Sequence, residues 1–286
     1  MEVVPGYECI PCVARLTLEA LDTTEASEEV CKKMMRRLLQ EAEQLLDDKT
    51  APLVVGNLTE YFCELTGEAD PYKQFKRTSV SLSLQILPGL RRLVAESPDP
   101  VLRAFELSAA ANAIDLVSLR KNELQQQMEK IAEAGKIEIK SEVMIQFRRE
   151  LEEAGEIFLI GDNTAEAVFD LLLLEQLNDK ELYYGVRGAP VLNDVTKVEA
   201  LETGIYRWAD IISSDSSVPG TILSQVSDEF LQHFKEADLV LAKGQGNFES
   251  LVEPPRPVYH LFKVKCKPLA TRLEYDLDDY VLISRS

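Results

Sequence analysis

The chain has 286 residues, of which 45% are hydrophobic and 28% charged, as is typical of a soluble protein with one large domain or two small ones. Its formal net charge of −18 would repel nucleic acid and anionic membranes, so we expect neither as a partner. The apolar runs are too short to cross a bilayer, and the start, MEVVPGYECIPC, lacks the features of a signal peptide. We therefore expect a cytoplasmic protein.

The first 150 residues are expected to be helical. Apolar residues recur at three- and four-residue spacing, with charges between them, in the segments 27–48, 72–95 and 100–131. The sequence Ser97-Pro98-Asp99-Pro100 marks a break and suits the start of a helix. These patterns predict an all-helical N-terminal domain at residues 1–150.

From residue 151 onward, short apolar runs alternate with helical patterns. The runs predict strands at 156–160, 181–186, 209–213, 238–242 and 257–263. Such alternation predicts an α/β domain at residues 151–286, with three layers and a mostly parallel, Rossmann-like sheet. Ligands of such sheets bind beyond the carboxyl ends of the strands.

Asp162 and Asn163 follow the first of these strands directly. One interpretation is a helix cap, in which the side chain accepts a backbone N–H and contributes about 1 kcal/mol. The other is a binding site, because Glu166 on the first helical turn adds a third oxygen-bearing side chain, and such groups suit magnesium or manganese. The local sequence leaves both open.

The second strand ends in a similar way, at Asn193 and Asp194. Asp194 lies 32 residues after Asp162, a normal length for one strand–helix–strand crossover. Adjacent parallel strands would bring the two carboxylates to the same edge of the sheet. The alternative is again a cap, here of the helix that starts near Thr196.

A third polar segment, LAKGQGNFE, follows the strand at 238–242. Lys243 closes the apolar run, and the turn Gly244-Gln245-Gly246 would let backbone N–H groups approach a phosphate. The pattern matches neither the dinucleotide fingerprint nor a P-loop. The loop SSDSSVPGT at 213–221 offers hydroxyls for phosphate or sugar contacts, or is simply a surface loop.

Cys9 and Cys12 form a C-x-x-C pair, and Cys266 lies in VKCKP. Three thiolates could share zinc or another soft metal, although a second C-x-x-C is missing. The alternative is that they are buried structural thiols. Five cysteines, an odd number, argue against a secreted disulfide framework.

Several spaced motifs together resemble one family. They are CIPC, IGDNTAEAVFD, VRGAPVLNDVT, LAKGQGNFE and VKCKP, in this order. This order is similar to that of the domain-of-unknown-function eighty-nine family, also called damage-control phosphatases (ARMT-like). The resemblance covers essentially the whole chain and looks closest to the archaeal and bacterial subfamily with an N-terminal cysteine pair. It implies a helical N-terminal part and an α/β domain that hydrolyses phosphometabolites with the help of a metal.

The resemblance also implies site residues. Asp162, Asn163 and Asp194 would be the catalytic residues and would hold a divalent metal (magnesium, manganese, cobalt or nickel). The residues that would contact substrate or its phosphate are Asn112, Asp115, Glu166, Arg187, Lys243, Gln245, Gly246, Asn247 and Lys265. The chain departs from the family pattern at Thr164-Ala165, where Ala-Gly is usual, and at Ala111, where Gly is common.

We therefore expect a metal-dependent phosphatase that hydrolyses phosphomonoesters of small metabolites, such as sugar phosphates or phosphopantetheine-like compounds, in metabolite damage control. Two alternatives stay open. Methyl transfer from S-adenosylmethionine would use the same domain class, but no Gly-rich loop follows the first strand. A non-catalytic metal- or phosphometabolite-binding protein would account for Ala165 and Ala111. The sequence does not indicate an oligomeric state.

Overall fold

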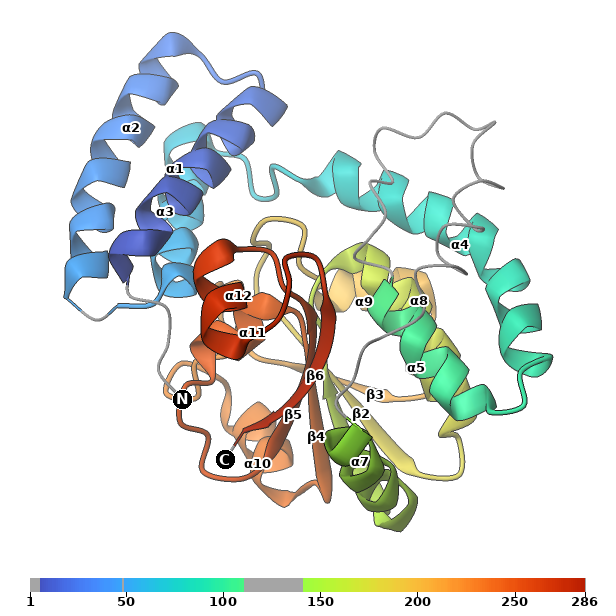
Figure 1. Cartoon of the computed structure of the whole chain (residues 1–286). Coiled ribbons are helices and arrows are strands. Elements are labelled where there is room, and N and C mark those ends of the chain that lie inside the picture. The colour runs from blue at the N-terminus through green and yellow to red at the C-terminus, as the bar shows by residue number, and fades with distance from the viewer. Residues whose placement is uncertain (1–5, 48, 111–140, 286) are drawn as a thin grey trace.

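The N-terminal helices pack on one another at one side of the molecule (Figure 1). The computed structural model describes residues 6–47, 49–110 and 141–285. The bundle consists of α1 (Gly6–Thr23), α2 (Glu28–Glu43) and α3 (Ala51–Thr66), with a 3₁₀ turn at Gln44–Leu46. Its shared apolar core includes Val13, Met34, Leu38, Leu58 and Phe62. None of the helices in the described ranges is long and apolar enough to cross a membrane.

A six-stranded sheet forms the centre of the rest of the chain. Its strands are β1 (Glu156–Ile160), β2 (Glu181–Val186), β3 (Asp210–Ser213), β4 (Leu239–Lys243), β5 (Val258–Lys263) and β6 (Tyr280–Arg285). They lie in the order β3-β2-β1-β4-β5-β6, and all neighbours are parallel except β5 and β6. The order reverses between β1 and β4, where ligands of open parallel sheets bind.

Helices cover both faces of this sheet. One face packs against α4 (Lys73–Ala95), α5 (Pro100–Ala110), α7 (Ser141–Glu153), α8 (Thr164–Gln176) and α9 (Lys197–Thr203). The other packs against α10 (Asp228–Glu236), α11 (Gln245–Ser250) and α12 (Lys267–Leu273). Successive residues of β1 alternate between the two cores, with Leu159 in the first and Phe158 in the second. The three-layer α/β prediction is confirmed.

Two helix groups precede the sheet in the chain. The bundle of α1 to α3 has its own core, whereas α4, α5 and α7 share the core of the first sheet face. The helices before residue 150 thus contribute to both parts. The boundary near residue 150 stays a sequence-based prediction.

Candidate functional site

Asn163, rather than Asp162, caps the helix that follows β1. The side-chain oxygen of Asn163 accepts the backbone N–H of Glu166 at 3.0 Å, and its amide nitrogen contacts the Glu166 carboxylate. Asp162 stands one residue earlier, half-buried at the end of the strand. Helix capping therefore explains the presence of Asn163 but not that of the Asp162 carboxylate. An amide oxygen has two lone pairs, so the cap does not exhaust Asn163 as a metal ligand.

The fold brings Asp194 to the same edge of the sheet as Asp162. Because β1 and β2 are parallel neighbours, the chain beyond β2 returns past the end of β1. The N–H of Val195 donates to the carbonyl of Asp162 at 2.8 Å, and the N–H of Thr164 donates to the carbonyl of Asn193 at 2.9 Å. The Thr164 hydroxyl donates to the same Asn193 carbonyl at 2.9 Å. The threonine of the unusual Thr164-Ala165 pair thus holds the loop that carries Asp194.

The Asp194 carboxylate is almost enclosed, with 5% of the residue exposed. Burial raises the pKa of Asp194 to about 7, and the negative charge of Asp162 adds to this shift while Arg187 opposes it. A bound cation would favour the charged form of Asp194.

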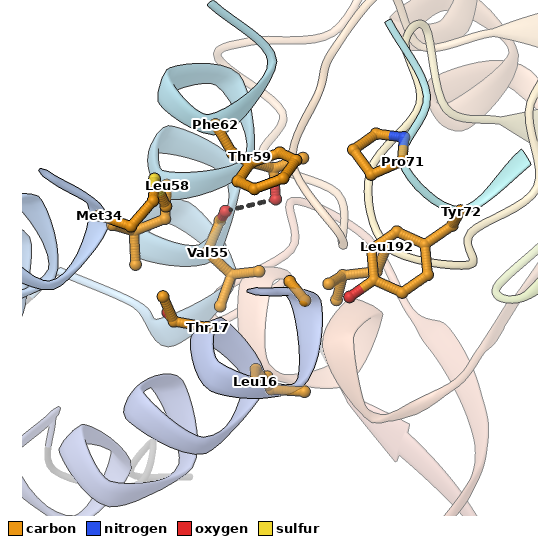
Figure 2. Close-up of a pocket in the computed structure, with 11 residues that line it drawn as sticks. Leu16, Thr17, Met34, Val55, Leu58, Thr59, Phe62, Pro71, Tyr72 and Leu192 are labelled. Carbon is orange, nitrogen blue, oxygen red and sulfur yellow. Dashed lines mark hydrogen bonds between the residues drawn. The ribbon is translucent and has the colours of Figure 1, made fainter. Parts of the chain in front are cut away.

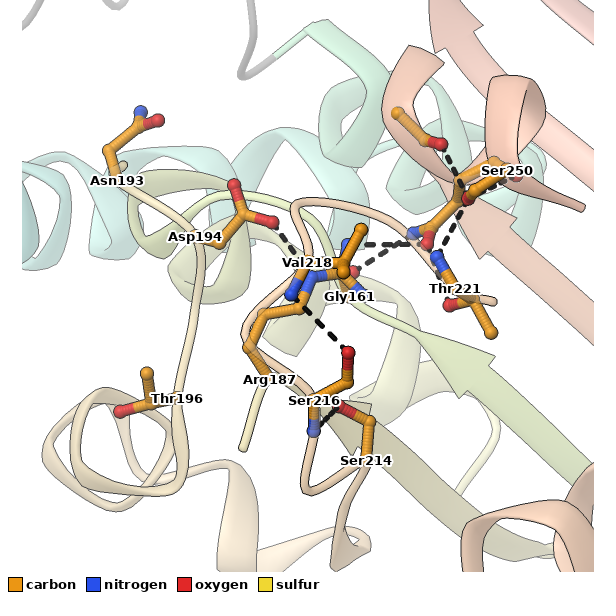
Figure 3. A network of polar contacts seen from close by, with 12 residues as sticks. Gly161, Arg187, Asn193, Asp194, Thr196, Ser214, Ser216, Val218, Thr221 and Ser250 are labelled. Atoms are coloured by element: carbon orange, nitrogen blue, oxygen red, sulfur yellow. Dashed lines mark hydrogen bonds and ion pairs between the residues drawn. The ribbon is translucent and has the colours of Figure 1, made fainter. Parts of the chain in front are cut away.

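Arg187 links Asp194 to α11, the helix after β4. Its Nε donates to Asp194 Oδ2 at 2.8 Å, and its Nη2 donates to Asn247 Oδ1 at 3.2 Å. Figure 3 shows the Asp194 carboxylate turned toward this guanidinium. Only 1% of Arg187 is exposed, and its third nitrogen, Nη1, has no hydrogen-bond partner among the described residues. A buried guanidinium nitrogen without a partner is rare and suits an anionic ligand.

Asn247 holds the ends of several elements together. Its Nδ2 donates to the carbonyls of Lys243 at 2.7 Å and Gly161 at 3.2 Å, while Thr221 donates to its Oδ1 at 2.8 Å. The residue is fully buried. Asn247 therefore orients Arg187 and fixes the ends of β1 and β4 relative to each other.

Gln245 and Gly246 begin α11, next to Asn247. Gln245 accepts the N–H of Lys265 at 2.9 Å and donates to Glu249 at 2.6 Å, and the Gly246 carbonyl accepts the Ser250 hydroxyl at 2.7 Å. These contacts shape the start of α11.

Lys243 lies beneath the edge of the sheet, which differs from the substrate contact expected for it. Its ammonium is 2.7 Å from Asp170 Oδ1 and 3.2 Å from Glu166 Oε2, and it donates to the Ser108 hydroxyl at 2.9 Å. The Tyr184 hydroxyl donates to the other Asp170 oxygen at 2.8 Å. Burial raises the pKa of Glu166 to about 8, although Lys243 opposes this shift. The ammonium thus balances two buried acids under the site.

Asp170 was not among the sequence-predicted residues. A signal was present, because an acid interrupts the apolar run AVFDLLLL in the middle of a predicted helix. A buried carboxylate in such a place needs a partner, and here the partners are Lys243, Tyr184 and Ser108.

Lys265 is exposed beside this edge of the sheet. Its charge lowers the pKa values of Glu166 and Asp194, opposing the effect of burial on both. Its backbone N–H donates to Gln245 Oε1 at 2.9 Å, which places Lys265 beside the start of α11. Asn112 and Asp115 fall outside the described residues.

The three cysteines of interest lie where α1 meets α12. Cys9 and Cys12 are on α1, and Cys266 immediately precedes α12. Burial, together with the nearby Glu249, Cys266 and Cys12, raises the pKa of Cys9 to about 12. Cys9 and Cys266 pack against the same apolar cluster, and Cys266 Sγ accepts from Gln245 at 3.6 Å.

The donors at the sheet edge fit a hard cation by their chemistry. Asp162 and Asp194 supply carboxylate oxygens and Asn163 an amide oxygen, which are groups that magnesium and manganese prefer. Throughout residues 6–47, 49–110 and 141–285, no three His, Cys, Asp or Glu side chains are placed to hold a metal. At this edge the third ligand would have to be Asn163. The zinc site of the cysteines stays a prediction.

The chain is similar to known proteins along nearly its whole length. Residues 6–281 match the family model described as damage-control phosphatase ARMT1-like domain. A damage-control phosphatase of Pyrococcus horikoshii is 27% identical, with 94% of this chain and 93% of that protein covered. An uncharacterized protein of Methanocaldococcus jannaschii is 29% identical over 97% of this chain and 94% of its own length.

A solved structure is similar along the whole chain. The crystal structure of a DUF89 family protein from Pyrococcus horikoshii superimposes with a TM-score of 0.84 at 25% identity, and 98% of each chain is covered. The placement in a subfamily with an N-terminal cysteine pair stays a prediction. Because the family model spans nearly the full length, the chain belongs to the damage-control phosphatase ARMT1-like family.

Proposed function

We propose that this protein is a metal-dependent phosphatase that hydrolyses phosphomonoesters of small metabolites. The observation that carries the proposal is the convergence of two acids and two cations at one sheet edge: Asp162, Asp194, Arg187 and Lys265. Such a group can bind a divalent cation and a phosphate side by side, even in a protein with a net charge of −18. Membership of a family whose relatives are named damage-control phosphatases supports the same function.

Asp162, Asn163 and Asp194 would hold the metal, which we expect to be magnesium, manganese, cobalt or nickel. When bound, such an ion acts as a Lewis acid toward a phosphoryl oxygen. The raised pKa of Asp194 supports this role, because burial beside Asp162 disfavours its charged form until a cation compensates it.

Arg187 and Lys265 would bind the phosphate. Hydrogen bonds to Asp194 and Asn247 fix two nitrogens of the Arg187 guanidinium, which leaves Nη1 to donate to a phosphate oxygen. A guanidinium held in this way loses little entropy when the ligand arrives. Lys265, two residues before α12, would add a second positive charge.

The buried network beneath the edge would keep these groups in place. Lys243, paired with Asp170, holds Glu166 next to Asn163. We assign Lys243 this supporting role in place of direct phosphate contact, because its ammonium is already paired with Asp170 and Glu166 and donates to Ser108.

Release of inorganic phosphate tests the proposal. The wild-type protein is incubated with p-nitrophenyl phosphate, sugar phosphates and phosphopantetheine, each with magnesium, manganese, cobalt, nickel or EDTA. We expect turnover with at least one metal and none with EDTA. Asp162→Ala should lose this turnover, whereas Asp179→Ala, which removes an exposed acid in the turn after α8, should keep it. Equal turnover by the two variants would refute the assignment.

A further inference from the structure

Leu192 has an unusual backbone conformation two residues before Asp194. Its φ of +46° lies in the left-handed region that leucine seldom adopts. Conformations of this kind persist only where the surrounding structure holds them, and they often accompany functional sites. The question is therefore what holds Leu192.

The helical bundle holds Leu192 in this conformation. Leu192 lines an apolar pocket together with Leu16 of α1, Val55, Leu58 and Phe62 of α3, and Tyr72. Figure 2 shows its side chain among these groups, beside the Tyr72 ring. The space left in the pocket is only about 30 Å³, far less than a small-molecule site needs. Leu192, which is half-buried, packs against the bundle core as one wall of this pocket.

The far end of the same loop is fixed to the same pocket wall. Thr196 and Glu199 form a capping box at the start of α9, in which the Thr196 N–H donates to Glu199 at 3.0 Å. The fully buried ammonium of Lys76 lies 2.7 Å from both Glu199 and Asp70. Asp70 precedes Pro71 and Tyr72, which line the pocket. One lysine therefore joins the pocket wall to the end of the loop.

Short backbone contacts connect Leu192 to Asp194. The Asp194 N–H donates to the Val191 carbonyl at 3.1 Å, which closes a tight turn around Leu192. The carbonyl of Asn193, which belongs to the same peptide group as the Asp194 N–H, accepts the N–H and the hydroxyl of Thr164. A shift of Leu192 would therefore move Asp194 relative to Asp162.

We propose that Leu192 is a positioning residue, and that its insertion into the α1–α3 bundle sets the metal affinity of the site at the sheet edge. This inference rests on the proposed function, because Asp194 is taken as a metal ligand. It gives the helical bundle a task in the reaction although the bundle supplies none of Asp162, Asn163 and Asp194.

Two matched truncations separate positioning from mere packing. Leu192→Ala and Leu58→Ala remove the same atoms from the same pocket, so both should lower the midpoint of thermal unfolding. Only Leu192→Ala should weaken Mn²⁺ binding, by about 10- to 100-fold, as is typical when a group that orients a metal ligand is lost. Leu192→Met, which refills the pocket, should restore most of the affinity. Binding is measured by calorimetry well below the unfolding midpoint of each variant.

A second readout needs no metal. In the metal-free protein, hydrogen exchange at the Asp194 and Val195 amides should accelerate at least 10-fold in Leu192→Ala and stay unchanged in Leu58→Ala. Equal Mn²⁺ affinity or equal exchange in the two alanine variants would overturn the inference. A wild-type protein that binds no Mn²⁺ would refute the proposed function and the effect on affinity, and exchange would still decide whether Leu192 anchors the loop.

Discussion

Replacing Gly244 with alanine would test the contact between two neighbouring strand ends. Gly244 has φ +81° and ψ 154°, a region that is essentially restricted to glycine, so a side chain there costs about 1–3 kcal/mol. A Cβ atom at this position would lie 2.1 Å from Cγ of Asp162. The two atoms cannot coexist at that distance, so one of them must move.

The Asp162 carboxylate is the group that can move. It stands at the end of a short, rotatable side chain, so rotation relieves the overlap without disturbing the backbone. We therefore expect the free energy of unfolding to fall only by the backbone strain, about 1–3 kcal/mol. Metal affinity should fall at least ~10-fold, because the rotated carboxylate leaves the edge of the sheet.

Gly67→Ala is the matched control. Gly67 ends α3 with φ +73°, and a Cβ there would meet no atom within 4 Å. It should cost about 1–2 kcal/mol of stability and leave the metal site unchanged. Urea denaturation and Mn²⁺ titration measure the two quantities. If Gly244→Ala bound Mn²⁺ as tightly as Gly67→Ala, the placement of Asp162 beside Gly244 as a metal ligand would be wrong.

Three further predictions concern Thr164, Lys76 and Asp194. Thr164→Val removes the hydroxyl bond to Asn193 and should lower the free energy of unfolding, measured in urea, by about 0.5–1.5 kcal/mol, while Thr164→Ser should lower it less. Lys76→Met leaves two carboxylates without their cation and should cost about 3–5 kcal/mol at pH 7. Burial tends to raise the folded-state pKa of Glu199, but hydrogen bonds from Lys76 and Thr196 lower it overall. The cost of Lys76→Met should therefore be present above pH 4.5 and shrink as the pH falls through the lowered pKa. A cost that does not change with pH would contradict the pairing of Lys76 with Glu199. Asp194 has the opposite sign: its folded pKa of about 7 exceeds its ordinary 3.8, so the metal-free protein should lose stability as the pH rises from about 4 to about 7. Over the same range Mn²⁺ binding should tighten and release protons, which calorimetry in two buffers would detect.

The strands of the sheet were predictable because buried parallel strands form continuous apolar runs. The five predicted strands agree with β1 to β5 within one residue at each end. β6 was missed, although Tyr280 to Ile283 is itself a short apolar run; its antiparallel pairing with β5 places it at the edge of the sheet. Two bundle helices were also missed: α1 contains Pro11, which argues against a helix interior, and α3 has few charges to mark an exposed face.

The site was predictable only where chain order fixes geometry. Asp162 and Asp194 follow adjacent parallel strands, so their meeting could be inferred from spacing alone. The burial of the Lys243 ammonium beneath the edge of the sheet could not be predicted, because it depends on Asp170 and Ser108 from two packed helices. The role of Leu192 also lay out of reach, since neither its backbone angle nor its pocket in a separate bundle is written in the local sequence.

The proposed function requires that the acids at the sheet edge hold a metal needed for phosphate release. The most direct measurement is Mn²⁺-dependent hydrolysis of p-nitrophenyl phosphate by the wild-type protein and by Asp194→Asn. This variant keeps an oxygen for Arg187 and removes only the charge. We predict that the wild type releases phosphate only with metal and that Asp194→Asn, folded to the same extent, loses at least ~10-fold in metal affinity and most of its turnover. Equal turnover of the two proteins, or full wild-type turnover in EDTA, would contradict a metal-dependent reaction at these acids.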